Sequence, residues 1–87
     1  MTKPVHSHKL LEVLARHLVD APELVRVDES EHRGITVLDV LVAPNDLGRM
    51  IGRQGRTADA VRTLVAAVAE RDGQRVSVEF HELGGGY

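Results

Sequence analysis

Apolar residues recur every three or four positions near the N-terminus, and polar residues fill most of the positions between them. This spacing places the apolar side chains on one face of a helix. It predicts a helix over residues 7–18, with Ser7 as a suitable N-cap residue. The helix should end before Pro22, because proline cannot continue it. We expect residues 1–6 to form a flexible arm.

Two strand-like stretches follow this helix. Residues 24–28 alternate between apolar and polar side chains, whereas residues 35–43 are β-branched or apolar nearly throughout. The polar residues 29–34 between them predict a turn with Gly34 as its hinge. The second stretch would carry apolar side chains on both faces: Leu38, Val40 and Val42 on one, and Ile35, Val37 and Leu41 on the other. Apolar residues on both faces favour either a central strand or a strand whose second face is covered. Burial against a partner subunit would explain this pattern, and so would an outer sheet face that is simply apolar.

The rest of the pattern predicts two helices joined by a glycine-containing loop, and then a last strand. Pro44 stops the preceding strand and begins a short helix, and a longer helix follows from about residue 56 or 57 to residue 71. The apolar stripe of the longer helix comprises Ala58, Val61, Leu64, Val65 and Val68. Residues 75–81 alternate as a strand, and residues 84–87 are expected to form a flexible tail. The order α-β-β-α-α-β predicts an α+β domain with the helices on one face of a three-stranded sheet.

The composition is that of one small folded domain, with 87 residues of which 43% are hydrophobic. There is no cysteine, which excludes disulfides and thiolate metal sites and suits a reducing compartment. The N-terminus lacks the apolar core of a secretion signal, and no apolar run approaches the roughly 18 residues of a membrane span. We therefore expect a cytoplasmic protein with no membrane segment.

Charge is unevenly distributed along the chain. The net charge of −2 argues against a protein that coats nucleic acid by general attraction. Residues 45–62 are nevertheless locally positive, because four arginines outnumber Asp46 and Asp59 there. A small basic site on an acidic body predicts modest binding of an anionic partner, such as nucleic acid, through few phosphates.

The candidate chemistry lies in this basic segment, where Gly52 and Gly55 enclose Arg53 and Gln54. Glycine permits backbone angles that a Cβ would forbid and lets another backbone come close. KH domains use a Gly-x-x-Gly loop between two helices to clamp about four nucleotides of RNA. The same pattern is also explained by glycines that merely end a helix. It is neither a Walker loop nor a dinucleotide fingerprint, because the residues that define those motifs are absent.

Residues 48–58 and 60–63 resemble the core of the KhpA family of small bacterial stand-alone KH-domain proteins. The resemblance covers residues 7–83 and implies a type II KH fold, with RNA contacts from the loop residues 52–55. It further implies an RNA chaperone or post-transcriptional regulator that works with a larger KhpB partner in cell-shape control and cell-wall biogenesis. Many KH loops carry lysine at one of the two central positions, where this chain has Arg53 and Gln54, and the change is expected to preserve binding and to alter preference.

Eight residues are the RNA-contact candidates: Gly52, Arg53, Gln54, Gly55, Arg56, Arg49, Ile51 and Arg62. Backbone N–H groups of the loop and of the following helix would meet the phosphates. Arg53 and Arg56 would neutralise charge, and Arg49 and Arg62 would be outer contacts. Ile51 would lie half in the core and half in an apolar groove lined also by Leu47 and Ala58. Selectivity should be shallow, because Phe80 and Tyr87 are the only aromatic residues and no stacking platform of the RRM kind is available.

Other functions fit less well or remain open. We expect no enzyme, metal or cofactor, because the histidines are scattered, His6 and His8 fall at the N-terminal arm, and Asp39 is most simply an outward-facing edge residue. A homodimer, or a heterodimer with a KhpB-like protein, would raise affinity through effective concentration. The apolar outer positions Ile35, Val37 and Leu41 are compatible with such a dimer. The main alternative is a protein-interaction subunit whose glycine loop is only structural.

Overall fold

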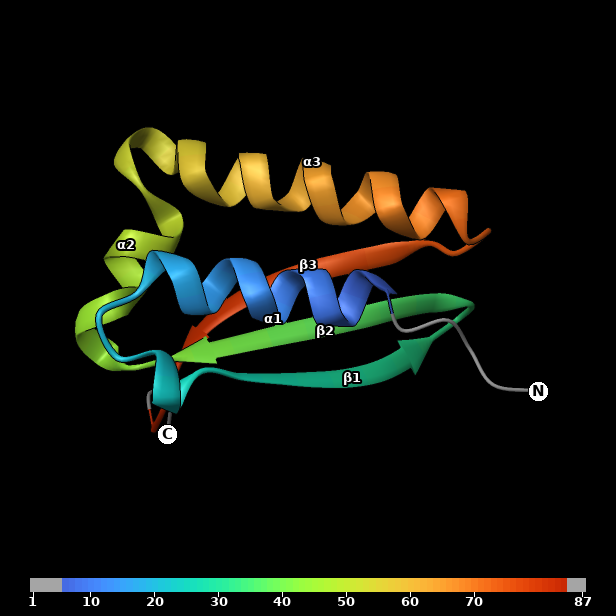
Figure 1. The fold of residues 1–87 in the computed structure, drawn as a ribbon. Helices are drawn as coiled ribbons and strands as arrows, with labels where there is room; N and C mark the ends of the chain where they lie inside the picture. The colour runs from blue at the N-terminus through green and yellow to red at the C-terminus, as the bar shows by residue number, and fades with distance from the viewer. Residues whose placement is uncertain (1–5, 85–87) are drawn as a thin grey trace.

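The computed structural model describes residues 6–84, in which three helices cover one face of a three-stranded sheet (Figure 1). The elements in chain order are α1 (His6–Leu18), β1 (Arg26–His32), β2 (Ile35–Val42), α2 (Leu47–Ile51), α3 (Arg56–Arg71) and β3 (Val76–Glu82). Single 3-10 turns precede β1, α2 and α3, at Pro22–Leu24, Pro44–Asp46 and Arg53–Gly55. The predicted α+β class, element order and helix placement are therefore confirmed.

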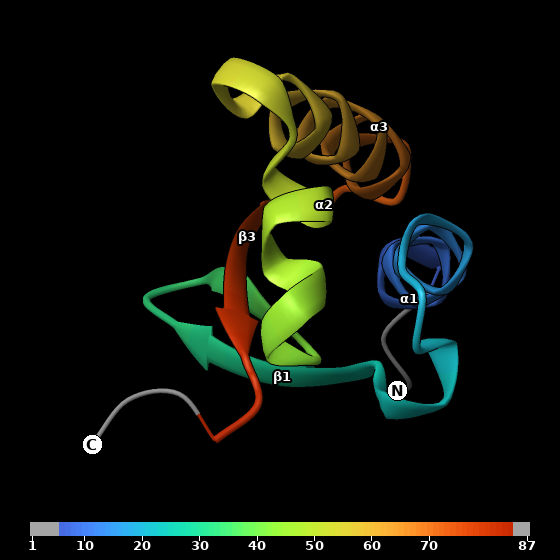
Figure 2. The same cartoon turned by 90° about the vertical axis from the view of Figure 1, so that its left-hand side faces the viewer.

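β2 is the central strand, which is one of the two arrangements that its apolar sequence favours. It pairs antiparallel with β1 and parallel with β3, so that Val40 lies opposite Val27 on one side and Phe80 on the other. Burial alternates along the whole of β2, with the even-numbered residues buried and the odd-numbered ones half-buried. The inner residues face the helices, and the outer residues lie on the sheet face that the helices do not cover (Figure 2).

The core forms where the inner face of β2 meets one side of each helix. Its fully buried members include Leu11 and Ala15 from α1, Met50 from α2, Val65 from α3 and Leu38 from β2. Each large apolar side chain buried in this way contributes about 1.5–3 kcal/mol relative to an exposed one. Packing between the helix layer and the sheet therefore holds α2 and the start of α3 in place.

The first helix begins one residue earlier than its sequence pattern predicts. His6 is its first residue, so Ser7 is buried in the first turn and does not act as the N-cap. The expectation that His6 and His8 lie on a loose arm is wrong. The Nδ1 atom of His6 lies 3.0 Å from Asp72 Oδ2, and that of His8 lies 2.9 Å from Glu29 Oε1. The rest of the predicted arm (residues 1–5) and most of the predicted tail (residues 85–87) fall outside the described residues.

The first strand lies further along the chain than expected. Leu24 belongs to a 3-10 turn, and the polar residues 29–32, predicted to form a turn, continue β1. Their strand conformation comes from main-chain pairing with β2, in which Glu31 opposes Thr36 and His32 opposes Ile35. An edge strand needs no apolar side chains for such pairing, and most of β1 is exposed. The periodicity of side chains could not reveal a strand of this kind.

The expected burial of Leu64 and the expected edge position of Asp39 are wrong. Leu64 is 51% exposed, and Ala69 takes its place in the buried stripe of α3 with Ala58, Val61 and Val65. The small side chains let α3 approach the sheet closely, while Leu64 points away from it. Asp39 faces outward, as expected, but it lies on the central strand and not at an edge, and its Oδ1 is 2.9 Å from Nε2 of His81.

Candidate nucleic-acid interface

The loop between α2 and α3 projects at one end of the molecule, above α2 and beyond the start of α3 (Figure 1). α2 ends when Gly52 turns to φ 76° and ψ 172°, and its N–H donates to the Gly48 carbonyl at 2.8 Å. A single 3-10 turn follows, closed by a hydrogen bond of 3.1 Å from the Gly55 N–H to the Gly52 carbonyl. Gly55, with φ 74° and ψ 11°, then leads directly into α3. The loop is therefore short and has a defined conformation.

The two glycines of the loop meet different requirements. A Cβ at Gly52 would overlap the Thr57 hydroxyl and would lie 2.7 Å from Thr57 Cβ and 2.9 Å from its backbone nitrogen. Gly52 is therefore needed both for its positive φ and for the close approach of α3. A Cβ at Gly55 would meet nothing within 4 Å, so only its positive φ favours glycine.

Gln54 holds a left-handed conformation, φ 57° and ψ 25°, that non-glycine residues adopt at a cost of about 1–2 kcal/mol. This geometry places Gln54 at the exposed tip of the loop, next to Arg53. Its side-chain oxygen accepts a hydrogen bond of 3.1 Å from Arg56 Nη2. The amide nitrogen of Gln54 is then left to donate to a ligand.

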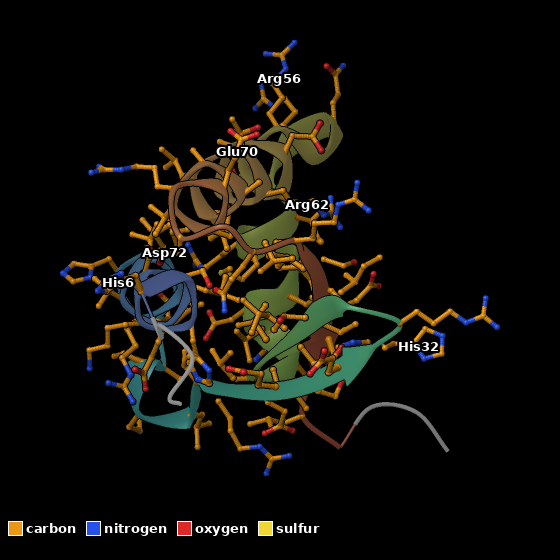
Figure 3. The ribbon with its side chains drawn as sticks, turned by 90° about the vertical axis from the view of Figure 1, so that its right-hand side faces the viewer. His6, His32, Arg56, Arg62, Glu70 and Asp72 are labelled. Carbon is orange, nitrogen blue, oxygen red and sulfur yellow. The ribbon has the colours of Figure 1, made fainter. Side chains whose placement is uncertain are left out.

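The arginines at the loop differ in how far contacts within the protein offset their charge. Within residues 6–84, the side chain of Arg53 is exposed and has no hydrogen bond or ion pair. The side chain of Arg56 is also exposed and points into solvent at the top of Figure 3, and among the described residues its hydrogen-bond partner is the neutral amide of Gln54. In the part of the chain that the structure describes, no side chain caps the start of α3, whose N-cap is Gly55. The loop therefore presents two guanidinium groups beside a helix N-terminus, an arrangement that attracts anions.

Arg49 is bound to carboxylates on the α1 side of α2. Its Nη2 lies 2.8 Å from Asp20 Oδ2, and its Nε lies 3.5 Å from Asp46 Oδ1. These two ion pairs offset its charge, so Arg49 is less available to a phosphate than Arg53.

Asp46 is a structural residue that sequence reasoning missed. Its side chain is buried and accepts hydrogen bonds of 3.0 Å from the backbone N–H groups of Asp20 and Ala21. It thereby ties the segment after α1 to the start of α2. The sequence gives no sign of this role, because an aspartate before a helix is ordinarily interpreted as its N-cap. The backbone N–H groups that its carboxylate accepts from belong to Asp20 and Ala21, which are distant in the sequence.

Arg62 lies on the other side of the site, where α3 meets β3 (Figure 3). Its Nε donates to the Val78 carbonyl at 3.2 Å, and its guanidinium carbon lies 4.9 Å from the centre of the Phe80 ring. α1 and β3 lie on opposite sides of α2 (Figure 2), so Arg49 and Arg62 are directed to opposite sides of the molecule. The structure therefore brings together the candidates from Ile51 to Arg56 but separates Arg49 and Arg62 from each other.

The apolar candidates also divide. Ile51 and Leu47 are half-buried, so each combines a core contact with some exposed surface. Ala58 is only 2% exposed and belongs to the core, so the expectation that it lines a groove is wrong.

Within the part of the chain that the structure describes, no three His, Asp or Glu side chains are grouped to hold a metal ion. No helix there has the length and apolar character needed to cross a bilayer.

A structural comparison supports the fold assignment. The chain matches a crystal structure of Era in complex with MgGDPNP and nucleotides 1506–1542 of 16S ribosomal RNA, with a TM-score of 0.64 at 15% sequence identity. The match covers 94% of this chain and 31% of the Era chain, so this chain spans about a third of that protein. At this level of identity the likeness concerns the fold alone.

Sequence comparisons give the family. A family model described as KhpA/KhpB, KH domain, matches residues 8–80. A protein of Clostridium acetobutylicum named RNA-binding protein KhpA is 45% identical over 72 residues, covering 83% of this chain and 96% of that one. The proteins of the same name from Aquifex aeolicus and Chlamydia trachomatis are 41% and 39% identical and cover 84% and 85% of this chain, and 92% and 95% of their own lengths. The chain thus belongs to the KhpA/KhpB family of KH-domain proteins.

Proposed function

We propose that this protein binds single-stranded RNA and that its Gly52–Gly55 loop holds the RNA by its phosphates. The observation that carries the proposal is the exposed side chain of Arg53, which has no partner within residues 6–84 and stands at the tip of a projecting loop. Relatives with up to 45% identity bear the name RNA-binding protein KhpA, which supports the same assignment.

The loop offers three kinds of donor to a phosphate. These are the guanidinium groups of Arg53 and Arg56, the amide nitrogen of Gln54, and the first N–H groups of α3, which no side chain caps. Charge-assisted hydrogen bonds from arginine are stronger than neutral ones, and the helix dipole adds to the attraction. The RNA chain would continue from the loop toward the side where α2, α3 and β3 meet, with Ile51 as an apolar contact.

The strength of binding follows from the number of available charges. Arg49 is held by Asp20 and Asp46, which leaves Arg53 and Arg56 as the main phosphate contacts. Each phosphate contact to a single strand contributes about 0.7 to the slope of log affinity against log salt. We expect modest affinity and a gentle slope of about −1.4 from these two contacts.

Fluorescence anisotropy with a labelled single-stranded RNA tests the proposal. The double variant Arg53→Asp, Gln54→Asp should lose binding while it keeps its circular dichroism spectrum and melting temperature. The control Arg33→Asp, Ser30→Asp makes the same change in charge on the β1–β2 hairpin, at the opposite end of the molecule (Figure 1), and should keep most of the affinity. Equal loss in both variants would indicate general attraction. Equal retention would favour a protein-interaction subunit whose loop is only structural.

The finer role rests on the family rather than on the site. We infer a binding protein and not an enzyme, acting in the cytoplasm as an RNA chaperone or post-transcriptional regulator. With a KhpB-type partner it would take part in cell-shape control and cell-wall biogenesis. A pull-down of KhpB from cells that express this chain with an affinity tag tests the partnership, and its absence from the eluate would contradict it.

We also propose a dimer that covers the outer face of the sheet, where Ile35, Val37 and Leu41 are half-buried. Val37→Asp should then shift the protein to monomer in sedimentation at high micromolar concentration, because a charge would be buried in the contact. Leu64→Asp is the control, since Leu64 is exposed on the helix layer. A wild type that sediments as a monomer, or a dimer that only Leu64→Asp disrupts, would contradict a contact through the sheet.

A further inference from the structure

Arg62 makes contacts that differ from those of the other arginines near the loop. Its Nε donates to the Val78 carbonyl on β3, and its guanidinium lies over the Phe80 ring with 4.9 Å between the guanidinium carbon and the ring centre. Its Nη1 also lies 3.6 Å from Asp59 Oδ1. These contacts from β3 and α3 hold the guanidinium in one place at the edge of the sheet.

These contacts make Arg62 a poor phosphate ligand but leave its guanidinium as a planar surface for stacking. The nearby Asp59 carboxylate offsets its charge and would repel a phosphate. The side chain is nevertheless 47% exposed, although Phe80 lies beneath it. Its outward surface is therefore open to solvent, and a guanidinium plane is a surface on which RNA bases stack.

The position of Arg62 relative to the loop suits a base of the same RNA. Arg62 follows Gly55 by seven residues in α3, or about 10 Å along the helix axis. The distance is within the reach of the roughly four nucleotides that a KH loop engages.

We propose that Arg62, supported by Phe80, forms a stacking platform for one base of the RNA whose backbone the Gly52–Gly55 loop holds. This inference rests on the proposed RNA binding. It replaces the expectation that Arg62 is an outer phosphate contact and that the chain has no stacking platform. The platform is a composite of one arginine and one aromatic ring that lie 18 residues apart in the sequence.

Binding of a short fluorescein-labelled oligoadenylate, with each position in turn made abasic, tests the platform. Wild type should lose about fivefold in affinity when one particular base is missing, since that base can no longer stack. Arg62→Lys keeps the charge but not the plane. It should bind the intact RNA about fivefold more weakly, with an unchanged salt slope, and should no longer respond to the loss of that base. Phe80→Leu, which removes the aromatic support and keeps an apolar side chain, should behave like Arg62→Lys.

Other results would overturn the platform. If Arg62→Lys binds like wild type, or still loses affinity at the same abasic position, Arg62 does not stack on a base. If Arg62→Lys and Phe80→Leu both lower the melting temperature but keep the wild-type affinity per folded molecule, the Arg62–Phe80 contact only stabilises the packing of α3 on β3. Loss of binding in Arg53→Asp, Gln54→Asp, with no effect of Arg62→Lys, would reject the platform and leave the loop intact as the clamp. Failure of wild type itself to bind RNA would reject both.

Discussion

At the scale of single residues, the loop depends on Gly52 more than on Gly55. Both have positive φ, but only at Gly52 would a Cβ collide with a neighbour, namely Thr57. The distinction is invisible in the sequence, where the two glycines of the motif are equivalent. It arises because α3 folds back so that Thr57 packs against the first glycine.

The substitution Gly52→Ala should therefore be the more damaging of the two. We expect it to lower the free energy of unfolding by more than about 2 kcal/mol, because backbone strain and a steric clash add. Gly55→Ala should cost about 1 kcal/mol, from backbone strain alone. Urea unfolding followed by circular dichroism measures both values. Equal costs for the two variants would show that Thr57 yields easily to the added methyl group.

Asp46 carries the second prediction at this scale. Asp46→Ala removes the acceptor of two backbone N–H groups and should cost about 3 kcal/mol in the free energy of unfolding. Asp20→Asn is the control, because Asp20 is 72% exposed and its ion pair with Arg49 lies at the surface. It should change stability by less than about 1 kcal/mol. If Asp46→Ala lowers the free energy of unfolding by less than about 1 kcal/mol, water replaces the carboxylate as the acceptor of the two N–H groups.

At the scale of elements, the sequence predicts those features of the fold that depend on the periodicity of apolar side chains. The order of helices and strands, the central place of β2 and the extent of α3 all follow from apolar spacing and from Pro44. The course of β1 does not, because residues 29–32 are held by main-chain pairing. The contacts of Arg49 and Arg62 could not be predicted either, since Asp20 and Phe80 reach them only through the fold.

The β1–β2 hairpin supplies the prediction at this scale. Arg33 and Gly34 form its two-residue turn with φ values of 53° and 81°, as in a type I′ turn. Arginine is strained there, whereas asparagine tolerates positive φ. Arg33→Asn should raise the free energy of unfolding by about 0.5–1 kcal/mol, measured by urea unfolding. A destabilised variant would show that Arg33 makes a contact that outweighs the strain.

At the scale of the whole molecule, the uneven distribution of charge over the fold explains how an acidic chain could bind RNA. The net charge is −2, yet Arg53 and Arg56 project from one end, while acidic Asp28 and Glu29 lie on β1. The core between α3 and β2 keeps the loop in place without contributing charge. RNA affinity should therefore depend on a few arginines at one end and not on overall attraction.

The salt dependence of RNA binding by wild type and Arg53→Gln tests this account most directly. Anisotropy titrations over a range of salt should give a slope of about −1.4 for wild type and about −0.7 for the variant, because one phosphate contact is lost. The variant should keep the wild-type circular dichroism spectrum. An unchanged slope in a variant that still folds would contradict the assignment of Arg53 as a phosphate contact of the loop.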